Sequence, residues 1–300
     1  MTKLFHACLL LVVASIMSGC ATYKLIEAAP TQSEPLTIVY SDEGASGWSD
    51  LPIGAYRVPD SQVIIFGHQK NSVGFLFGVV GILAQNAVQS SQGASAVADV
   101  RTVLQVNLNH EAEEISTALI GSGQFGSAYR TGAGANGPVL TVNPYVVITF
   151  VNDVQVRPYV ILKATLRGPK NNSLWTARYI ASVDKPLPLE GIESYTADGG
   201  ARLKAALAKE LELDIKFMLA DVASPRVRDD TKLLYVESSV PFMRQRLGML
   251  GYEISQDDGS VVFAPKIGDA LVMAGVHVLD KSVTTYRPAT KDDKLKLLED

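Results

Sequence analysis

VLTVNPYVVITFV, at residues 139–151, lies in the most strand-rich part of the chain and decides the fold class. RPYVILKATL at 157–166 and LWTARYIASV at 174–183 follow it. These runs are dense in β-branched and aromatic residues, which favour extended strands. The connection RGPKNNS, at 167–173, contains Gly, Pro and Asn and indicates a turn. We therefore predict an antiparallel meander built from these runs.

A long helix is predicted to follow the meander, beginning at Asp198 and ending near Val222. Apolar residues recur in this stretch at spacings of three and four, which places them on one side of a helix. They are Leu203, Leu207, Leu211, Ile215, Leu219 and Val222. We expect the helix to pack this stripe on the apolar face of the meander.

The segments before the meander predict further strands and another helix. Strands are expected at 36–40 and 62–66. Residues 101–108 alternate between apolar and polar side chains, which indicates a half-buried strand, although a helix continuing from Ala96 is an alternative. Asn109 is placed to cap the next helix, because acidic residues fill the turn that follows it.

Pro225 marks a boundary, and a smaller unit with the order β-α-β-β-β is expected at 225–288. Its predicted strands are 233–237, 252–255, 261–264 and 271–279, and its predicted helix is 241–250. The charge-rich tail at 289–300 is expected to fray. The sequence thus predicts an α+β fold. A main domain at 37–224 would have an antiparallel sheet (meander) with helices packed on one face, followed by the smaller C-terminal α+β unit.

The first twenty residues, MTKLFHACLLLVVASIMSGC, have the order of a secretory signal peptide. Lys3 precedes an apolar run that is shorter than the ~20 residues needed to cross a membrane as a helix. The chain has two cysteines, and Cys8 lies inside the signal. Cys20 would therefore be the one thiol of the exported protein, and such a leftover cysteine calls for an explanation.

The end of this signal resembles the lipobox of Gram-negative bacterial lipoproteins, with Met in place of the usual Leu at the first position. The residues that carry the resemblance are Met17, Ser18, Gly19 and Cys20. It implies that residues 1–19 are removed and that Cys20 is acylated, which anchors the chain to the lipid bilayer. Residues 20–36 would then form a lipid-anchored tether. Ala21 stands where Asp would retain the protein in the inner membrane, so the resemblance implies the outer membrane, facing the periplasm.

The charge balance is mildly acidic. The formal net charge is −4, and it becomes about −5 once Lys3 leaves with the signal, with 26 basic residues against 31 acidic ones. Lys and Arg form no block in the sequence, so we expect neither a nucleic-acid partner nor a polybasic patch for anionic lipid. With one cysteine left, a disulfide cannot stabilise the fold, and an apolar core must do so.

Two glycine patterns match GxGxxG, at 121–126 and 132–137. A dinucleotide-binding loop must follow a strand and open a helix, so that helix amides meet the pyrophosphate. The first pattern ends a predicted helix, and the second leads into Pro138 and a strand. We interpret both as connecting loops and expect no cofactor.

Residue types that carry catalysis or bind metal are scattered. Past the signal the histidines are His68, His110 and His277, with no metal-binding spacing between them. The paired carboxylates at 229–230, 257–258 and 292–293 lie in turn-like or tail sequence and are interpreted as solvated. No GxSxG nucleophile elbow occurs. We expect no metal site and a protein that is not an enzyme.

GFLFGVVGILAQNAV, at 74–88, has no charge. As a helix, residues 73–88 would extend ~24 Å, short of a ~30 Å hydrocarbon core. Four interpretations stay open: a buried core helix or hairpin, an amphipathic or re-entrant segment that contacts membrane or partner, a segment that inserts when copies assemble, and a linker or disordered stretch. The residues that would make such a contact are Gly74, Phe75, Phe77, Gly78, Gly81 and Ile82.

Two classes of function follow from these features. In gross plan the chain resembles the α+β accessory lipoproteins of Gram-negative envelopes, which implies a non-enzymatic periplasmic binding, scaffold or transport-accessory role with an envelope protein partner. It is also loosely similar in plan to the curli-secretion channel lipoprotein, which implies self-assembly into an export pore through 73–88. An envelope hydrolase is the third alternative, because distant carboxylates can meet in a fold.

Overall fold

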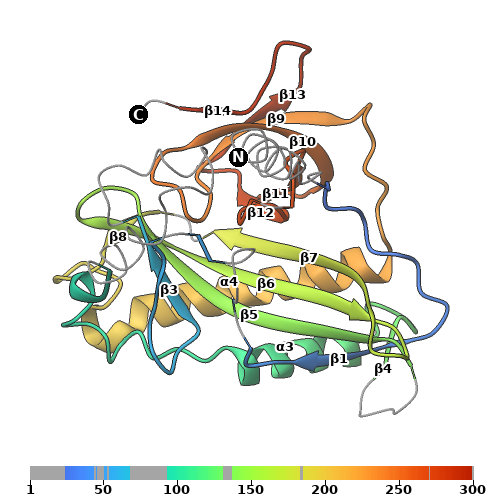
Figure 1. Cartoon of the computed structure of the whole chain (residues 1–300), viewed down its shortest axis with the longest axis horizontal. Helices are drawn as coiled ribbons and strands as arrows, with labels where there is room; N and C mark the ends of the chain where they lie inside the picture. The colour runs from blue at the N-terminus through green and yellow to red at the C-terminus, as the bar shows by residue number, and fades with distance from the viewer. Residues whose placement is uncertain are drawn as a thin grey trace, which may run out of the picture.

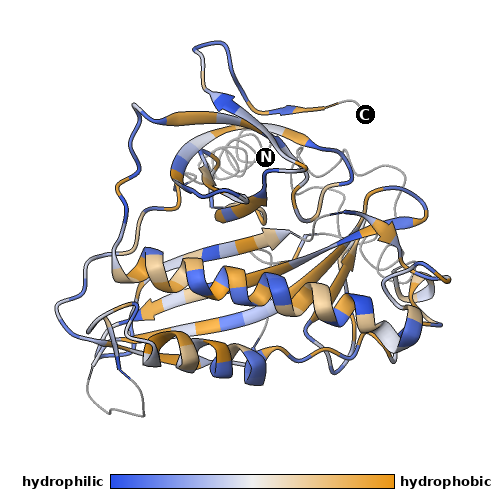
Figure 2. Ribbon diagram, turned by 180° about the vertical axis from the view of Figure 1, so that it is seen from behind, coloured by the Kyte–Doolittle hydropathy of each residue, from blue (hydrophilic) through white to orange (hydrophobic). Residues whose placement is uncertain are grey.

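The structure is a computed structural model, and it describes residues 24–43, 45, 51–52, 54–67, 93–130, 137–182, 185–269 and 271–298. The fold is mixed α/β and is dominated by a fourteen-stranded sheet, most of whose strand pairs are antiparallel (Figure 1). Two long helices, α3 (Asn109–Gly121) and α4 (Ala197–Ala223), run beside one another along the central strands (Figures 1 and 2).

The strands cross the sheet in the order β13-β9-β10-β11-β12-β7-β6-β5-β1-β4. In addition β14 pairs with β10, β8 with β6, and β3 with both β2 and β5. The bounds are β1 Leu36–Tyr40, β2 Tyr56–Arg57, β3 Val63–Phe66, β4 Tyr129–Arg130, β5 Val139–Phe150, β6 Gln155–Arg167, β7 Ser173–Ser182, β8 Leu187–Pro188, β9 Leu233–Ser238, β10 Leu247–Gln256, β11 Ser260–Pro265, β12 Val276–Asp280, β13 Thr285–Pro288 and β14 Lys296–Leu297.

The predicted meander is confirmed as β5, β6 and β7. Its strands pair antiparallel, with Tyr145 opposite Ile161 and Ile161 opposite Ile180. Side chains of β6 are buried on both faces of the sheet, because Val160 belongs to the main hydrophobic cluster and Ile161 to a second cluster on the other face. The strands at 36–40 and 62–66 are also confirmed, as β1 and β3, and both lie parallel to β5.

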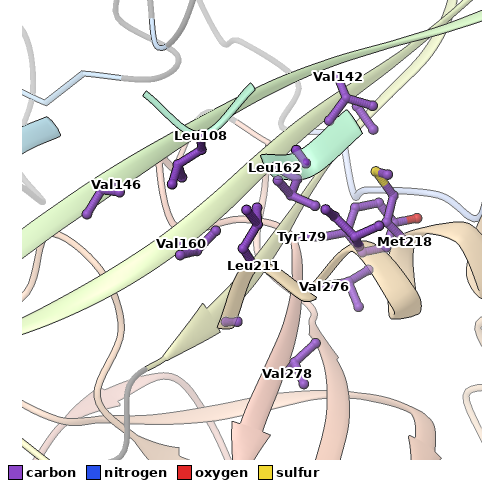
Figure 3. Packing of buried hydrophobic residues seen from close by; sticks show 14 of the residues in the cluster. Leu108, Val142, Val146, Val160, Leu162, Tyr179, Leu211, Met218, Val276 and Val278 are labelled. Carbon is purple, nitrogen blue, oxygen red and sulfur yellow. The ribbon is translucent and has the colours of Figure 1, made fainter. Parts of the chain in front are cut away.

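The apolar stripe of α4 is buried as the sequence predicts. All of its members are at most 3% exposed, and they join the main cluster with residues of β6 and β7. Leu211 and Met218 of α4 lie among Leu162 and Tyr179 in Figure 3. The predicted start is corrected: Asp198 does not cap the helix, because it lies in a left-handed kink with Gly199 and Gly200.

The C-terminal strands belong to the same sheet as the meander. β12 pairs parallel with β7, with Val276 opposite Tyr179, so the expected smaller unit continues the central sheet through a shared edge. Figures 1 and 2 show β9–β13 on the side of the central strands away from the two helices. These strands bury a cluster of their own, which includes Val236, Met249 and Phe263. The strand expected at 271–279 is shorter than predicted, since β12 begins at Val276.

The helix predicted at 241–250 is wrong. Residues 241–246 form turns, Phe242 has a left-handed backbone with φ of 65°, and β10 begins at Leu247. β10 pairs on both sides, with β9 and with β11. A Cβ on Gly251 would lie 2.3 Å from the Ala264 carbonyl oxygen, so glycine there permits the close approach of two strands. Within the stretch predicted as helix, residues 247–250 pair with β9, and Leu247 and Gly248 also pair with β14, so strand pairing decides its structure.

Residues 101–108 form neither of the two predicted structures. They make turns after a short helical segment at 93–96. Their backbone groups bond to the neighbouring loop instead of to a strand: Val106 N donates to Ser61 Oγ, and Leu108 N donates to Gln62 Oε1 at 2.6 Å. The helix after them is confirmed, although Leu108 rather than Asn109 takes the N-cap position and no side chain caps it.

The C-terminal tail is held in place over its described residues. β14 pairs with β10, and Asp293 accepts two hydrogen bonds from the Arg287 guanidinium, at 2.6 and 2.7 Å. The expectation that residues 289–300 fray is therefore wrong for 289–298. A bidentate hydrogen bond between a guanidinium and a carboxylate fixes the relative orientation of the two side chains better than a single ion-pair contact does.

We predict that Leu211→Ala lowers the free energy of unfolding by about 2–5 kcal/mol, because it leaves a cavity between α4 and the sheet. Urea denaturation followed by circular dichroism measures the change. Ile192→Ala is the control, since Ile192 is 94% exposed and its truncation should stay within about 0.5 kcal/mol of wild type. Equal effects of the two substitutions would contradict the packing.

Candidate functional site

The residues singled out for anchoring and for membrane or partner contact lie outside the described part of the chain. These are Met17, Ser18, Gly19 and Cys20, together with Gly74, Phe75, Phe77, Gly78, Gly81 and Ile82 of the segment 73–88. The expectations for them stay predictions. What the structure does describe is where the chain goes immediately after the anchor.

Residues 24–29, which we call the N-terminal clasp, are docked on the fold. Two hydrogen bonds join Lys24 and Asp269. Asp269 N donates to the Lys24 carbonyl at 2.9 Å, and Lys24 N donates to the side-chain oxygen Asp269 Oδ1 at 3.3 Å. The Trp175 indole N–H donates to the Glu27 carbonyl at 2.9 Å. The described part of the expected tether is therefore attached to the domain, because the folded strands supply partners for its backbone.

The clasp also joins the two hydrophobic clusters on which it lies. Ile26 is partly buried and packs against both the main cluster and the C-terminal cluster. Ala29 is 4% exposed and belongs to the main cluster. Leu25 forms an antiparallel bridge with Gly268. This docking could not be predicted from the sequence, because the apolar groups of 24–29 are few and irregularly spaced.

An open hollow lies at the end of the central strands where β5 begins and β6 ends; we call it the terminal hollow. Its volume is about 530 Å³. Its lining is formed by Val39, Ser41, Glu43, Gly137, Val139, Thr141, Arg167, Gly168, Pro169 and Asn171. Aliphatic, hydroxyl, amide and charged groups are thus mixed along one surface, which suits recognition of a ligand that has both apolar and polar parts.

Strand register places the side chains of the terminal hollow. Val39 lies opposite Thr141, and Thr141 lies opposite Thr165, so these residues form a row across β1, β5 and β6 on one face. Val39 is 45% exposed, and Leu174, which adjoins Gly168, is 50% exposed. Two aliphatic side chains are therefore open to solvent beside a hollow with polar groups.

A buried polar network connects the meander to α4. Asp221 Oδ2 accepts a hydrogen bond from the Tyr179 hydroxyl at 2.9 Å and lies 3.4 Å from Arg228 Nη2. Burial, followed by the Asp221 charge, raises the pKa of Tyr179 well above its ordinary value. The Tyr129 hydroxyl donates to the Leu219 carbonyl at 2.6 Å nearby. These contacts join β7, α4 and the chain that leaves α4, which is a structural role.

Besides this network, α4 carries a buried acidic pair, Glu210 and Asp214, which lie one helical turn apart. They are 3% and 0% exposed. Burial, and then the neighbouring Glu210, raises the pKa of Asp214 well above its ordinary value. Two carboxyl groups in one dry site favour a protonated form. Because both side chains are sealed from solvent, a substrate in water does not reach them.

The histidines are placed apart, as the sequence suggests, and His68 lies outside the described residues. His110 is exposed at the start of α3, 3.3 Å from Glu114. His277 is buried, and its Nε2–H donates to the Met273 carbonyl at 2.8 Å. Burial lowers the pKa of His277 to about 4. Within the described residues, no group of His, Cys, Asp or Glu is arranged to hold a metal ion.

The paired carboxylates lie in turns or beside a cation, as expected. Asp229 accepts from Thr231, and Asp230 accepts from Lys266 Nζ at 2.7 Å; these hydrogen bonds lower the pKa of both acids. Asp257 binds the hydroxyl and the amide of Ser260 in the β10–β11 turn. Asp229, Asp230 and Asp257 are thus engaged locally, and none of them is among the described residues that line the terminal hollow.

The first GxGxxG pattern is a loop, as predicted: Gly121 ends α3, and turns follow it. The second lies outside the described residues except for Gly137, where a Cβ would lie 2.1 Å from the Arg130 guanidinium. Among the helices of the described part of the chain, none is long and apolar enough to cross a membrane. Comparisons with protein-family models, with curated proteins and with solved structures find no match to this chain.

We predict that acid destabilises the fold through His277. The unfolded chain takes up a proton near pH 6.5, whereas the folded chain takes it up near pH 4. The free energy of unfolding therefore falls as the pH drops through this window, by about 3 kcal/mol in total from this group. Urea denaturation at a series of pH values measures the slope in wild type and in His277→Gln.

In His277→Gln, the free energy of unfolding should lose the part of its pH dependence that His277 contributes. This holds whatever the stability of the variant at pH 7. The matched control is His110→Gln, at an exposed position, which should follow the wild-type curve. A His277→Gln curve parallel to wild type between pH 6.5 and 4 would show that the imidazole is not held neutral by burial.

We predict that Asp214→Asn stabilises the protein at neutral pH. A raised folded pKa means that the contribution of Asp214 to stability is present below pH 3.8 and is lost as the pH rises through the folded pKa. Asn has no proton to lose, so its advantage in melting temperature should be larger at pH 7 than at pH 4. Glu212→Gln, at an exposed position on the same helix, is the control and should show no such difference. An Asp214→Asn advantage that is the same at both pH values would contradict the raised pKa.

Proposed function

We propose that this chain is an outer-membrane lipoprotein, acylated at Cys20 and facing the periplasm, that acts as a non-enzymatic binding or scaffold protein. The observation that carries the binding role is the terminal hollow, with Val39 and Leu174 open to solvent beside it. In this proposal α3 and α4 cover one face of the central strands, and the end of the other face receives a segment of an envelope protein. Their contacts with β1, β5, β6 and β7 support that arrangement.

The chemistry of the lining supports recognition rather than catalysis. Among the described residues of the lining, Glu43 and Arg167 are ionisable, and an arginine stays charged at any ordinary pH, so it does not exchange protons in a reaction. The acids with perturbed pKa values lie elsewhere: Asp214 is sealed under α4, and Asp230 is bonded to Lys266. A guanidinium, hydroxyl groups and an amide beside aliphatic side chains suit an extended polypeptide.

The outer edge of β1 supports the same role. Among the described strands, β4 pairs with Leu36 and Thr37 of β1, and the pairing ends there. Within the described residues, the stretch from Ile38 to Tyr40 beside the hollow therefore has no paired strand on that side. A partner strand could add to such an edge through backbone hydrogen bonds while its side chains enter the hollow.

The alternative of an export-pore subunit depends on residues 73–88 and stays a prediction, because these residues lie outside the described part of the chain. The third alternative, an envelope hydrolase, needs two carboxyl groups in one open site. Of the lining residues that the structure describes, Glu43 alone carries a carboxylate, so the proposed function does not rest on hydrolysis by a carboxylate pair.

The test is photo-crosslinking in cells that produce the full chain. A photoreactive amino acid replaces Val39 or Leu174 at the hollow, and Val154 or Ile192, which are 63% and 94% exposed, at the control positions. We expect a discrete adduct from the hollow positions and none from the controls. Arg167→Glu should weaken the adduct by about tenfold, the effect of losing about 1.4 kcal/mol of binding free energy.

Mass spectrometry of the adduct identifies the partner, and the purified partner then gives the affinity directly. Adducts of equal yield at Val39 and Ile192 would show that contact at the hollow is not specific. Arg167→Glu protein with an unchanged circular dichroism spectrum and an unchanged adduct would exclude the hollow as the binding site.

A further inference from the structure

The N-terminal clasp lies very close in sequence to the anchor. Four residue steps separate Cys20 from Lys24, the first residue of the clasp. A fully extended chain covers at most about 3.3–3.6 Å per residue, so Lys24 lies within about 14 Å of the acylated cysteine. This limit follows from chain length alone and holds for any conformation of the residues between them.

That reach is short compared with the domain. A chain of roughly 280 residues has a radius of gyration on the order of 19 Å, which corresponds to a diameter of about 50 Å. If the tether were free as far as residue 36, the domain could turn any side toward the bilayer. Because the clasp is docked through Asp269, Trp175 and Ile26, the free part ends at Lys24. The side that carries Lys24 is then held at the membrane.

The surface beside Lys24 is defined by residues that the clasp contacts and by their neighbours; we call it the anchor-side surface. It consists of Lys24, Leu25, Glu27, Lys266, Gly268 and Asp269, with Asp230 bonded to Lys266. Leu25 is 39% exposed, and the Lys24 and Glu27 side chains are about two-thirds exposed. α3 contacts α4, β1 and β5, and it lies on the side of the sheet away from the C-terminal strands (Figures 1 and 2).

The anchor-side surface is not a basic patch. Lys24 and Lys266 stand against Glu27, Asp230 and Asp269, so cationic groups do not outnumber anionic ones. Attraction to anionic headgroups, worth about 1 kcal/mol for each unopposed Lys or Arg, is therefore not the force that orients the domain. The short link to the acyl chains supplies the constraint, and added salt does not screen a covalent link.

We propose that the anchor-side surface faces the lipid bilayer and that the clasp fixes the domain in this orientation. The proposal rests on the proposed acylation of Cys20. It gives the clasp a function beyond packing: docking of residues 24–29 shortens the tether from the expected residues 20–36 to residues 20–23, which converts a loosely attached domain into an oriented one.

The test uses the acylated protein in vesicles of phosphatidylethanolamine and phosphatidylglycerol with a nitroxide quencher on a fraction of the headgroups. Cys8 leaves with the signal and Cys20 is acylated, so an introduced cysteine is the one free thiol for a fluorescent dye. Glu27→Cys places the dye on the anchor-side surface, and Glu113→Cys places it on α3. We expect several-fold stronger quenching at position 27 than at position 113, unchanged by added salt.

A flexible insertion is the matched variant. About 12 Gly and Ser residues between Ala21 and Thr22 add a coil with a root-mean-square span of about 20 Å, and the quenching ratio should fall toward one while acylation persists. Equal quenching at the two positions without the insertion would overturn the proposal, as would a ratio that salt abolishes. The mass of the purified protein shows whether acyl chains are attached, and so separates failure of the orientation proposal from failure of the lipoprotein proposal. Wild-type protein without acyl chains would overturn the proposed lipoprotein function itself. Cys20→Ser protein that stays on the vesicles would do the same.

Discussion

Burial of β6 and β7 on both faces is the constraint on which the rest of this structure depends. Val160, Leu162 and Tyr179 lie in the main cluster, and Ile161 and Ile180 lie in the cluster of the opposite face. Strands of this kind need a cover on each side, because each exposed aliphatic side chain would cost about 1.5–3 kcal/mol. α4 contacts them through its apolar stripe, and residues such as Phe242 and Val272 from the C-terminal part join the other cluster.

The polar groups of the interior follow from the same constraint. A long helix that crosses a buried sheet carries some ionisable residues into the dry layer, and each of these needs a partner or a proton. Asp221 finds Tyr179 and Arg228, whereas Asp214 lies beside Glu210, and its pKa is raised. The raised pKa values of Asp214 and Tyr179 are therefore products of burial, and the open surface with varied chemistry lies elsewhere, at the terminal hollow.

In the proposed lipoprotein, the residues that link the lipid anchor to the domain are also part of the fold. The clasp bonds to two different parts of the fold, Trp175 of β7 and Asp269 in the connection between β11 and β12. It therefore adds a further connection between parts that already share the β7–β12 pairing. In the proposed lipoprotein, a segment that sequence analysis treats as a spacer becomes part of the fold and sets how the domain meets the membrane.

The sequence by itself determined the elements whose pattern is local: the β-branched and aromatic runs of the meander, the periodic stripe of α4, and the turn between β6 and β7, which occupies 168–172 of the predicted 167–173. Tertiary structure alone decided three others. Residues 247–250 became strand because β9 pairs with them on one side and β14 pairs with Leu247 and Gly248 on the other. Residues 101–108 became turns and irregular chain, and Ser61 and Gln62 bond their backbone at Val106 and Leu108. Residues 24–29 became a clasp because distant strands gave them partners. The physical reason is common to all three: a hydrogen bond to a residue far along the chain leaves no periodic mark in the sequence.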